Sequence, residues 1–417
     1  MGQPVRFIHA ADFHLDAPFK GVDATDDRVR RTLVESTYRA LDAVVDACID
    51  RGVDFLVIAG DAYNSRDKSV RAQFAFQRAM QRLAEADIPV YLTWGNHDPA
   101  DGWSAGITLP QSVHVFSARE VERVVFDREG VTCAIYGRSF RKAAETENLA
   151  RTFVRDPGDR LAIGLLHANV GGQRDYDDYA PCSADDLKAA RMDYWALGHI
   201  HKPEVLFAGS VTAAYAGCTQ GLDPTQTGGR GCWEVTLDEG GAQLAFVPTA
   251  EVVWDAATVD VGDVDCIEDV HGLLIDVCEA TSRGAGDRPA VLRIDLTGRS
   301  EVHAELTRPG VLHDLVEEVR ADAMGGEPWV WVDRVRDHTR PAIDLDVLRD
   351  SEEFAGDLVR LTDDLLADPD AAAQLVAELV GPLLDKAGAD VAAPDSVAVL
   401  EAARSLALDR LLAEEDR

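Results

Sequence analysis

Five short polar clusters, each at the end of an apolar run, constrain this chain more than any other feature of its sequence. The apolar runs cover residues 5–10, 55–59, 90–94, 161–166 and 194–197, and short runs of this kind predict buried β-strands. Residues two apart on a strand point to the same side. In an open α/β sheet, ligands bind beyond the carboxyl ends of the strands. We therefore expect the five clusters to converge on one site.

The polar clusters contain side chains that can hold divalent cations. The candidate ligands are Asp12, His14, Asp61, Asn96, His167, His199 and His201. A bridging carboxylate, for which Asp61 is the best candidate, can hold two cations about 3.5–4 Å apart and so serve an in-line attack on phosphorus. Oxygen and nitrogen ligands without thiolate suit Mn²⁺, Fe²⁺ or Zn²⁺, and Mg²⁺ is an alternative. The sequence predicts two divalent metal ions, with Mn²⁺ preferred.

The rest of the chain predicts an α/β protein with several parts. Strand and helix patterns alternate over the first 230 residues or so, with helices at 33–48 and 69–86 and Gly52 as a C-terminal cap. Residues 251–350 mix a helix at 264–280 with strands, which predicts a smaller α/β unit. The final stretch, 351–417, has a helical pattern with Asp395 or Ser396 as N-cap and an apolar stripe of Leu400, Ala403, Ala407 and Leu411. We expect domains at 1–250, 251–350 and 351–417.

The charge of the chain bears on whether it binds nucleic acid. The net charge is −33, of which residues 1–250 carry −9 and residues 251–417 carry −24. Binding to DNA depends on local Lys and Arg contacts with phosphates rather than on the total charge. Three local basic groups in residues 1–250 could make such phosphate contacts: Arg28, Arg30 and Arg31; Arg66, Lys68 and Arg71; Arg138, Arg141 and Lys142. For each group, an ordinary solvated helix face is the alternative interpretation.

Two further features concern the location of the protein. The sequence contains no run of about 18 apolar residues and no apolar signal core near its start, which predicts a cytoplasmic protein outside the membrane. The seven cysteines lack a close-paired metal-binding spacing. Reduced, mostly structural thiols are the better interpretation.

Taken in order, the motifs resemble those of the calcineurin-like metallophosphoesterase superfamily over residues 5 to about 235. The resemblance implies a four-layer β-sandwich flanked by helices. By motif, one metal ion would take Asp12, His14, Asp61 and His201, and the other would take Asp61, Asn96, His167 and His199. His97 would stabilise the transition state or assist the leaving oxygen, and Asp98 would orient it.

Finer sequence features resemble the SbcD and YhaO type of DNA-repair exonuclease. These include the stretches 10–20, 94–99, 193–201 and 216–221. The resemblance implies a small α/β capping domain, C-terminal helices that bind an SMC-like ATPase of the SbcC or YhaN type, and a homodimer as one arrangement. In relatives, the residue three after the bridging Asp is a His with a role in exonuclease activity, whereas this chain has Asn64. We expect Asn64 and Arg66 to contact substrate.

Three functions remain open at this stage. The favoured one is a metal-dependent DNA exo- or endonuclease in DNA repair that works beside a separate ATPase, because the sequence contains no phosphate-binding Gly-x-x-x-x-Gly-Lys-Ser/Thr loop. A phosphodiesterase or phosphatase for small nucleotides would use the same ligands. A catalytically silent scaffold subunit is the third alternative, and the complete ligand set argues against it.

Overall fold

The structure is a computed structural model that describes residues 3–19, 22, 26–64, 69–128, 130–387 and 395–415. The chain divides into two compact units. The first comprises Met1–Gly298 and Ala304–Thr339, and the second comprises Arg299–His303 and Arg340–Arg417. The larger sheets belong to the first unit, and the second unit is mainly helical.

The first six-stranded sheet has the spatial order β12-β11-β1-β2-β3-β4. Strands β1 to β4 are parallel to one another, whereas β11 and β12 add to the β1 edge in antiparallel fashion. The carboxyl ends of β1, β2 and β3 therefore lie along the same edge. The strands are β1 (Val5–Ala10), β2 (Phe55–Ala59), β3 (Val90–Thr93), β4 (Val113–Val115), β11 (Gly231–Asp238) and β12 (Gly241–Pro248).

The second six-stranded sheet has the order β5-β6-β7-β8-β10-β9. Its four inner strands are parallel, and the two edge strands are antiparallel to their neighbours. Strands β7 and β8 consequently end side by side. The strands are β5 (Glu122–Arg128), β6 (Val131–Gly137), β7 (Ala162–His167), β8 (Tyr194–Gly198), β9 (Glu204–Phe207) and β10 (Thr212–Tyr215).

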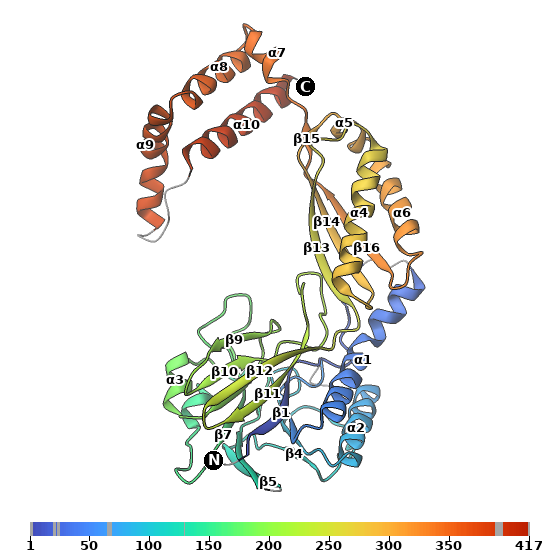
Figure 1. Ribbon diagram of the computed structural model, residues 1–417, viewed down its shortest axis with the longest axis vertical. Helices are drawn as coiled ribbons and strands as arrows, with labels where there is room; N and C mark the ends of the chain where they lie inside the picture. The colour runs from blue at the N-terminus through green and yellow to red at the C-terminus, as the bar shows by residue number, and fades with distance from the viewer. Residues whose placement is uncertain are drawn as a thin grey trace. The chain divides into compact units, whose positions relative to one another are not determined.

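These two sheets and their helices form four layers (Figure 1). Between the sheets lies an apolar core in which the rings of Phe7 and Phe55 stack with their centroids 5.1 Å apart. Helices α1 (Asp27–Arg51) and α2 (Val70–Glu85) cover the outer face of the first sheet. The shorter η1 (Leu149–Thr152) and α3 (Ala184–Ala189) pack on the second sheet. The predicted fold class is confirmed.

Local sequence signals define the ends of the two long helices. The side chain of Asp26 accepts hydrogen bonds from the first amides of α1, and Gly52 ends that helix with a φ of 57°. Ser69 caps α2 by accepting a hydrogen bond from the amide of Ala72. Such caps satisfy backbone groups that have no partner within a helix. The predicted Gly52 cap and the helix within 69–86 are both present.

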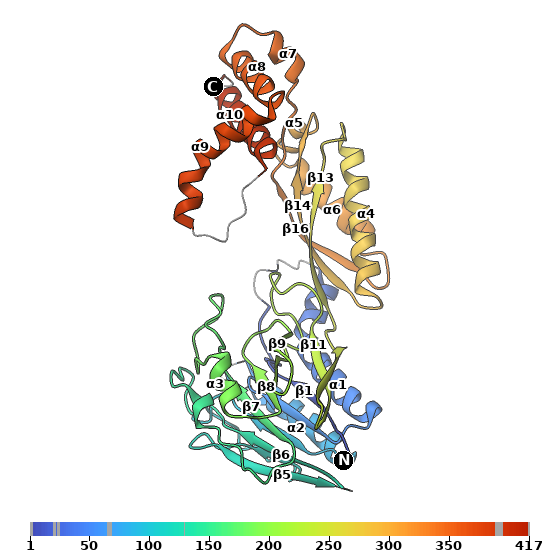
Figure 2. The ribbon, with the colours of Figure 1, turned by 60° about the vertical axis from the view of Figure 1, so that its left-hand side comes forward.

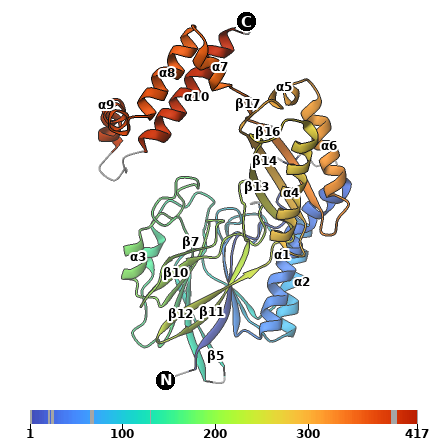
Figure 3. The same cartoon turned by 45° about the horizontal axis from the view of Figure 1, so that its top comes forward.

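A smaller parallel sheet in the first unit has the order β13-β14-β16. Helices α4 (Ile267–Ala285) and α6 (Val311–Ala323) lie on the same face of this sheet (Figure 3). Residues Val270, Leu274 and Cys278 of α4 are buried. The strands are β13 (Val253–Asp260), β14 (Ala290–Thr297) and β16 (Val330–Asp337), and the short α5 (His303–Leu306) directly precedes α6 in sequence.

The second unit consists mainly of the predicted C-terminal helices (Figure 2). Val359 and Leu408 belong to its small apolar core, and Asp395 caps the last helix through the amide of Val397 at 2.9 Å. Its elements are β15 (Arg299–Ser300), β17 (Arg340–Pro341), α7 (Leu345–Asp350), α8 (Phe354–Leu366), α9 (Pro369–Ala387) and α10 (Ser396–Glu415).

Two general expectations can be compared with the structure. All seven cysteines are free thiols, and only Cys266 is exposed. Most of them are therefore packing residues, as the sequence predicts. Within the described ranges, every helix is too short or too polar to span a bilayer.

Candidate metal centre

The loops that follow the central strands bring the predicted ligands to one place. The loops after β1 and β2 are joined, because the amide of Asp12 donates to the Gly60 carbonyl at 3.1 Å and the amide of His14 donates to the Asp61 carbonyl at 3.0 Å. Across the sandwich, the amide of His199 donates to both carboxylate oxygens of Asp12, at 3.2 and 3.1 Å. The two sheets therefore contribute to a single cluster of side chains.

Short distances connect the donor atoms of this cluster. His14 Nε2 lies 3.0 Å from His201 Nε2 and 3.8 Å from Asp61 Oδ2. His167 Nε2 lies 3.4 Å from Asp61 Oδ2 and 2.9 Å from Asn96 Oδ1. Asp12, His14 and Asp61 each belong to two of the three sets whose donor atoms all lie within 4.8 Å of one another: Asp12 with His14 and His201, His14 with Asp61 and His97, and Asp12 with Asp61 and His167. Asp61 Oδ2 lies close both to His14, expected at one ion, and to His167, expected at the other, as a bridging carboxylate requires.

Four of the predicted ligands have left-handed backbone conformations. Their φ angles are 51° for Asp12, 45° for His14, 52° for Asp61 and 101° for His199. Non-glycine residues rarely adopt such angles, which cost of order 1–3 kcal/mol each and cluster at functional sites. The fold therefore maintains local strain where these side chains turn towards one another.

Glycine precedes several ligands in the sequence, and close contacts explain two of these positions. A Cβ atom at Gly95 would lie 2.3 Å from Asp61 Oδ1 and 2.9 Å from His167 Cε1. At Gly60, where φ is 89°, a Cβ atom would lie 2.4 Å from His167 Nδ1. Both distances are far below a van der Waals contact. The ligands can approach one another because no side chain is present at these positions.

Backbone carbonyls fix the tautomers of two histidines. His167 Nδ1 donates to the Ala59 carbonyl at 2.9 Å, so that its Nε2 lone pair points into the cluster. His199 Nε2 donates to the Asp177 carbonyl at 2.8 Å, which leaves Nδ1 as the ligand atom. The centroids of the two rings are 5.1 Å apart. Outer hydrogen bonds of this kind orient metal-binding histidines.

Burial disfavours charge of either sign in this cluster. It lowers the pKa of His167 and His201 to about 3, and together with neighbouring imidazoles it holds the pKa of His14 well below its ordinary value. Burial also raises the pKa of Asp12 and Asp61, and for Asp12 the nearby charge of Asp61 adds to the effect. Neutral imidazoles are the form that binds metals, and a cation would stabilise the ionised carboxylates.

One local observation fits the residues to metal ions. The 3.0 Å between His14 Nε2 and His201 Nε2 matches two nitrogens that share one cation, since each would lie about 2.0–2.1 Å from it. The residues present therefore fit a metal-binding site.

His97 borders the cluster as a separate group. Its ring meets that of His14 edge to face, with centroids 4.7 Å apart, and its amide donates to Asp61 Oδ1 at 2.9 Å. Its Nδ1 donates to the backbone carbonyl of Asn64 at 2.8 Å. Its Nε2 atom is thus left for another partner, and because His97 also belongs to one of the candidate ligand sets, the role expected for it stays a prediction.

The other residues expected near substrate have different positions. The carboxylate of Asp98, which we expected to orient His97, accepts hydrogen bonds from the amides of Gly95 at 2.8 Å and Tyr63 at 3.2 Å. It therefore braces the backbone on both sides of the site. Asn64 contacts His97 through its carbonyl, a role that its side chain does not determine. Arg66 lies outside the described residues.

A cavity of about 320 Å³ opens at the cluster and is lined by Asp61, Asn96, His97, Arg174, Asp175, Tyr176, Asp177, His199 and His201. Sequence reasoning missed the loop that contributes Arg174 and Tyr176. The hydroxyl of Tyr176 accepts a hydrogen bond from the amide of His201 at 3.2 Å. Arg174 has no hydrogen bond or ion pair with any residue that the structure describes. It is therefore a free cation at the cavity wall.

Buried Asn169 holds this loop in place. Its Oδ1 accepts from the amide of Gln173 at 2.8 Å, and its Nδ2 donates to the carbonyls of Gln173 at 3.2 Å and Asp177 at 3.3 Å. The neighbouring Gly171 and Gly172 have φ angles of 78° and 67°. Consecutive glycines just after a strand that ends in a ligand are the sequence signal that could have indicated a loop at the site.

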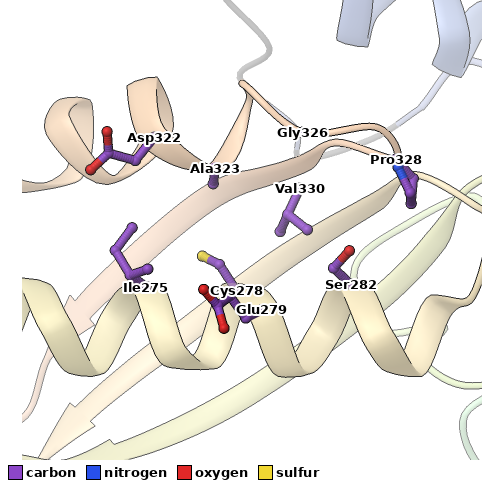
Figure 4. Close-up of a pocket in the computed structure, with 9 residues that line it drawn as sticks. All are labelled: Ile275, Cys278, Glu279, Ser282, Asp322, Ala323, Gly326, Pro328 and Val330. Carbon is purple, nitrogen blue, oxygen red and sulfur yellow. The ribbon is translucent and has the colours of Figure 1, made fainter.

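A second hollow, in the smaller α/β part, has a different character (Figure 4). Ile275 and Cys278 of α4 face Val330 of β16 across it. Burial raises the pKa of the Cys278 thiol to about 11, so the sulfur is protonated at neutral pH. This hollow lacks the converging donors of the metal centre and is apolar where the two elements meet.

Comparison with known families and proteins gives consistent matches. The calcineurin-like phosphoesterase family matches residues 5–203, and the family described as "Metallophosphoesterase YhaO, middle domain" matches residues 254–340. The chain is 33% identical over 340 residues to the uncharacterised metallophosphoesterase YhaO of Bacillus subtilis (strain 168), a match that covers 81% of this chain and 83% of that protein.

Two more distant relatives have names that refer to nucleases or DNA repair. The DNA double-strand break repair protein Mre11 of Sulfurisphaera tokodaii is 27% identical over 207 residues, which cover 48% of this chain and 50% of that protein. The SbcD component of the nuclease SbcCD of Bacillus subtilis (strain 168) is 24% identical over 247 residues, which cover 51% of this chain and 61% of that protein.

Proposed function

Because the chain belongs to the calcineurin-like metallophosphoesterase family, we propose that it is a DNA nuclease that uses two divalent metal ions. The family implies a metal-dependent phosphoester hydrolase with a dimetal centre. The observation that carries the proposal is the buried cluster around Asp61, whose Oδ2 lies 3.8 Å from His14 Nε2 and 3.4 Å from His167 Nε2. The similarity to an Mre11 protein and to the nuclease component SbcD supports DNA as the substrate.

The residues of the cavity have distinct roles in this proposal. Bound metal ions would polarise the phosphoryl oxygens and lower the pKa of water. The seven predicted ligands would hold the two ions. Asp61 would be shared, and the other ligands would divide as the family motif implies: Asp12, His14 and His201 at one ion, and Asn96, His167 and His199 at the other. His97, held through Nδ1, offers Nε2 to the phosphoryl group or leaving oxygen. The Arg174 guanidinium is suited to bind a phosphate oxygen, because it lines the cavity without a partner among the described residues.

We propose Mn²⁺ as the metal ion. Carboxylate, amide and imidazole ligands without thiolate suit Mn²⁺, Fe²⁺ and Zn²⁺, and Mg²⁺ is accommodated less well by several nitrogen ligands. The order of hydrolysis rates with these ions, added to metal-free protein, tests the preference. A higher rate with Zn²⁺ or Mg²⁺ than with Mn²⁺ would reject it.

We also propose that the C-terminal helices bind an SMC-like ATPase. Large apolar side chains are exposed on three of these helices, with exposed fractions of 66% for Val347, 69% for Phe354 and 65% for Leu379. Exposed apolar side chains on helices suit partner helices. Replacement of Phe354 by Glu should abolish co-purification with the ATPase and leave metal binding intact. Retained association with the ATPase would mean that another surface of the chain makes the contact.

The balance of nuclease products depends on Asn64 in this proposal. An amide cannot shuttle a proton near neutral pH, so we expect endonuclease products to exceed exonuclease products. The Asn64→His variant should raise the exonuclease share. Its backbone carbonyl would still hold His97. An unchanged ratio on end-labelled DNA would contradict the expectation.

Cleavage assays with Mn²⁺ test the proposed function. The protein should cleave single-stranded or linear double-stranded DNA, and the Asp61→Asn variant should not. A cyclic nucleotide should be a poor substrate. Rapid hydrolysis of the cyclic nucleotide without any DNA cleavage would instead assign a small-nucleotide phosphodiesterase, and no hydrolysis of either would favour a scaffold role.

A further inference from the structure

The three basic groups of the sequence differ in their ion pairs. In the first, Arg28 pairs with Glu327, and Arg30 pairs with Asp27 at 2.5 Å. In the second, Arg71 pairs with Glu35 at 2.5 Å. Arginines already paired with carboxylates have less positive charge available for another anion. The described members of these two groups therefore behave mainly as solvated helix surfaces.

The third group is largely unpaired. Arg138, Arg141 and Lys142 line a hollow of about 510 Å³ together with Arg119. Among the described residues, no carboxylate pairs with Arg119, Arg141 or Lys142. The Nη1 atom of Arg138 donates to the Thr152 hydroxyl at 3.2 Å, but its Nε is buried without a partner. The hollow therefore contains free donors and available positive charge.

Three acidic residues also line this hollow: Asp101, Glu145 and Glu147. The side chain of Glu145 is buried and accepts a hydrogen bond from the amide of Glu147 at 3.3 Å. The four cations outnumber these acids. In a chain with a net charge of −33, such a local excess of positive charge is a departure from the overall charge.

Backbone contacts connect this hollow to the metal centre. The amide of Phe140 donates to the Trp94 carbonyl at 2.9 Å, and the Phe140 ring lies edge-on to His167 with centroids 5.5 Å apart. The next residue, Arg141, accepts a hydrogen bond at its carbonyl from the amide of Asp101 at 3.1 Å. The basic residues thus follow directly on a side chain that packs against a metal ligand.

We propose that this hollow is a second phosphate-binding subsite, which holds a phosphate of a nucleic-acid strand other than the one at the metal centre. Guanidinium groups bind phosphate through paired hydrogen bonds, and a lysine adds a point charge. Because this hollow and the cavity at the metal centre share no lining residue, a small nucleotide with one phosphodiester would occupy only one of them, whereas a strand would contact both. The inference rests on the proposed function for the identity of the strand as DNA, and it explains how a long substrate would be preferred.

The proposal predicts a separation between binding of a strand and hydrolysis of a small ester. The double variant Arg141→Ala with Lys142→Ala removes two exposed cations that line the hollow. The matched control, Arg30→Ala with Arg31→Ala, makes the same change in charge on α1, where Arg30 is already paired. Binding of a fluorescent oligothymidylate is measured by anisotropy with chelator present, from about 50 to about 200 mM salt, the range over which phosphate contacts lose affinity.

The first double variant should bind the oligonucleotide at least about fivefold more weakly at low salt, with a log–log salt slope shallower by about 0.7, the contribution of one single-strand phosphate contact. The control should remain within about twofold of the wild type. Hydrolysis of bis(p-nitrophenyl) phosphate with Mn²⁺ should change by less than about twofold in either variant, because this ester needs only the metal centre.

Any of three results would overturn the subsite. The first variant could bind as tightly as the wild type, the control could lose as much affinity as the first variant, or the wild type could fail to bind the oligonucleotide. Failure of the proposed function looks different. In that case the wild type would bind the oligonucleotide through Arg141 and Lys142 and yet leave it uncut with Mn²⁺. Cleavage of DNA by a wild type whose binding does not depend on these residues would retain the nuclease and reject the subsite.

Discussion

At the metal centre, Asp12, His14 and Asp61 are almost fully buried and have left-handed backbone angles. In the second unit, by contrast, Phe354 and Leu361 of the regular helix α8 are 69% and 58% exposed. The first region buries polar groups that water would solvate better. The second exposes apolar groups that packing would cover. Each region therefore departs from the usual distribution of side chains, in opposite directions.

The difference indicates what each region is built to bind. Burial of titratable groups without charge partners costs free energy in the isolated chain, and bound cations would offset this cost. Exposed apolar side chains cost little in the isolated chain, but they favour association with another apolar surface. Substitutions should accordingly impair chemistry at the metal centre and association or packing in the helices.

The largest effect should come from His97, which contacts the cluster but is not among the assigned ligands. His97→Ala should reduce turnover about 10²- to 10⁴-fold, the usual contribution of a general acid or base. Its binding of Mn²⁺, measured by calorimetry, should stay within about tenfold of the wild type, because the assigned ligands are intact. Turnover at the full rate, or complete loss of metal binding, would contradict the distinction between ligands and His97.

A matched pair of glycines tests whether close approach defines the metal centre. In Gly95→Ala, the new Cβ would lie 2.3 Å from Asp61 Oδ1, so we expect metal affinity to fall about 10- to 100-fold. In Gly272→Ala, nothing lies within 4 Å of the new Cβ, and the helix should gain about 0.5–1 kcal/mol. Metal titration and urea unfolding measure the two effects. Unchanged affinity in Gly95→Ala would show that Asp61 can move freely.

Two residues of α8 test the packing of the helical unit. Val359 is fully buried and Leu361 is 58% exposed. Val359→Ala should lower the free energy of unfolding by about 2 kcal/mol through loss of buried volume, and Leu361→Ala should change it by less than about 0.5 kcal/mol. Urea denaturation of the full chain, monitored by circular dichroism, provides the comparison. Equal losses would show that this face of α8 is packed differently.

A further effect concerns acid sensitivity next to the metal centre. Burial lowers the pKa of His9 from 6.5 to about 3, and its ring contacts Tyr194 Oη at 2.9 Å. The unfolded chain gains a proton on this residue below pH 6.5 while the folded chain does not, so stability falls as the pH drops from about 6.5 towards 3. His9→Gln should reduce this slope by up to about 1.4 kcal/mol per pH unit.

Unfolding in urea at several pH values, with chelator in all samples, measures that slope. The comparison uses the slope and not the absolute stability, because the glutamine also alters packing. The same slope in both proteins would mean that His9 titrates normally in the folded state.

The sequence indicated which residues come together at the cluster, because metal-binding chemistry restricts the residue types and their places; that they bind metal ions stays a prediction. Only a few side chains bind hard cations, and the glycine before Asp61 leaves the room that His167 needs. Loop geometry was not accessible in the same way. Arg174 and Tyr176 reach the cavity through hydrogen bonds between Asn169 and the loop backbone, and no periodic pattern encodes such contacts.

The helices show the limits of periodicity. The sequence predicted an apolar stripe on α10 that included Leu400 and Ala403, yet Ala403 is exposed and Leu408 is buried instead. The face of α10 towards α8 contains Arg404, which pairs with Asp363 at 2.9 Å. A charged residue therefore occupies part of the packed face. A pattern of apolar residues alone cannot identify that arrangement.

Metal stoichiometry tests the central claim most directly. Metal-free protein titrated with Mn²⁺ should bind two ions per chain at the Asp61 cluster, and Asp61→Asn should lose at least one of them. The matched control is Asp87→Asn, because Asp87 has a similar φ of 57° but lies in an exposed turn. Two ions in the wild type and in the control, with fewer in Asp61→Asn, would support a two-ion site that shares Asp61. No bound Mn²⁺ in the wild type, or two ions retained by Asp61→Asn, would contradict it.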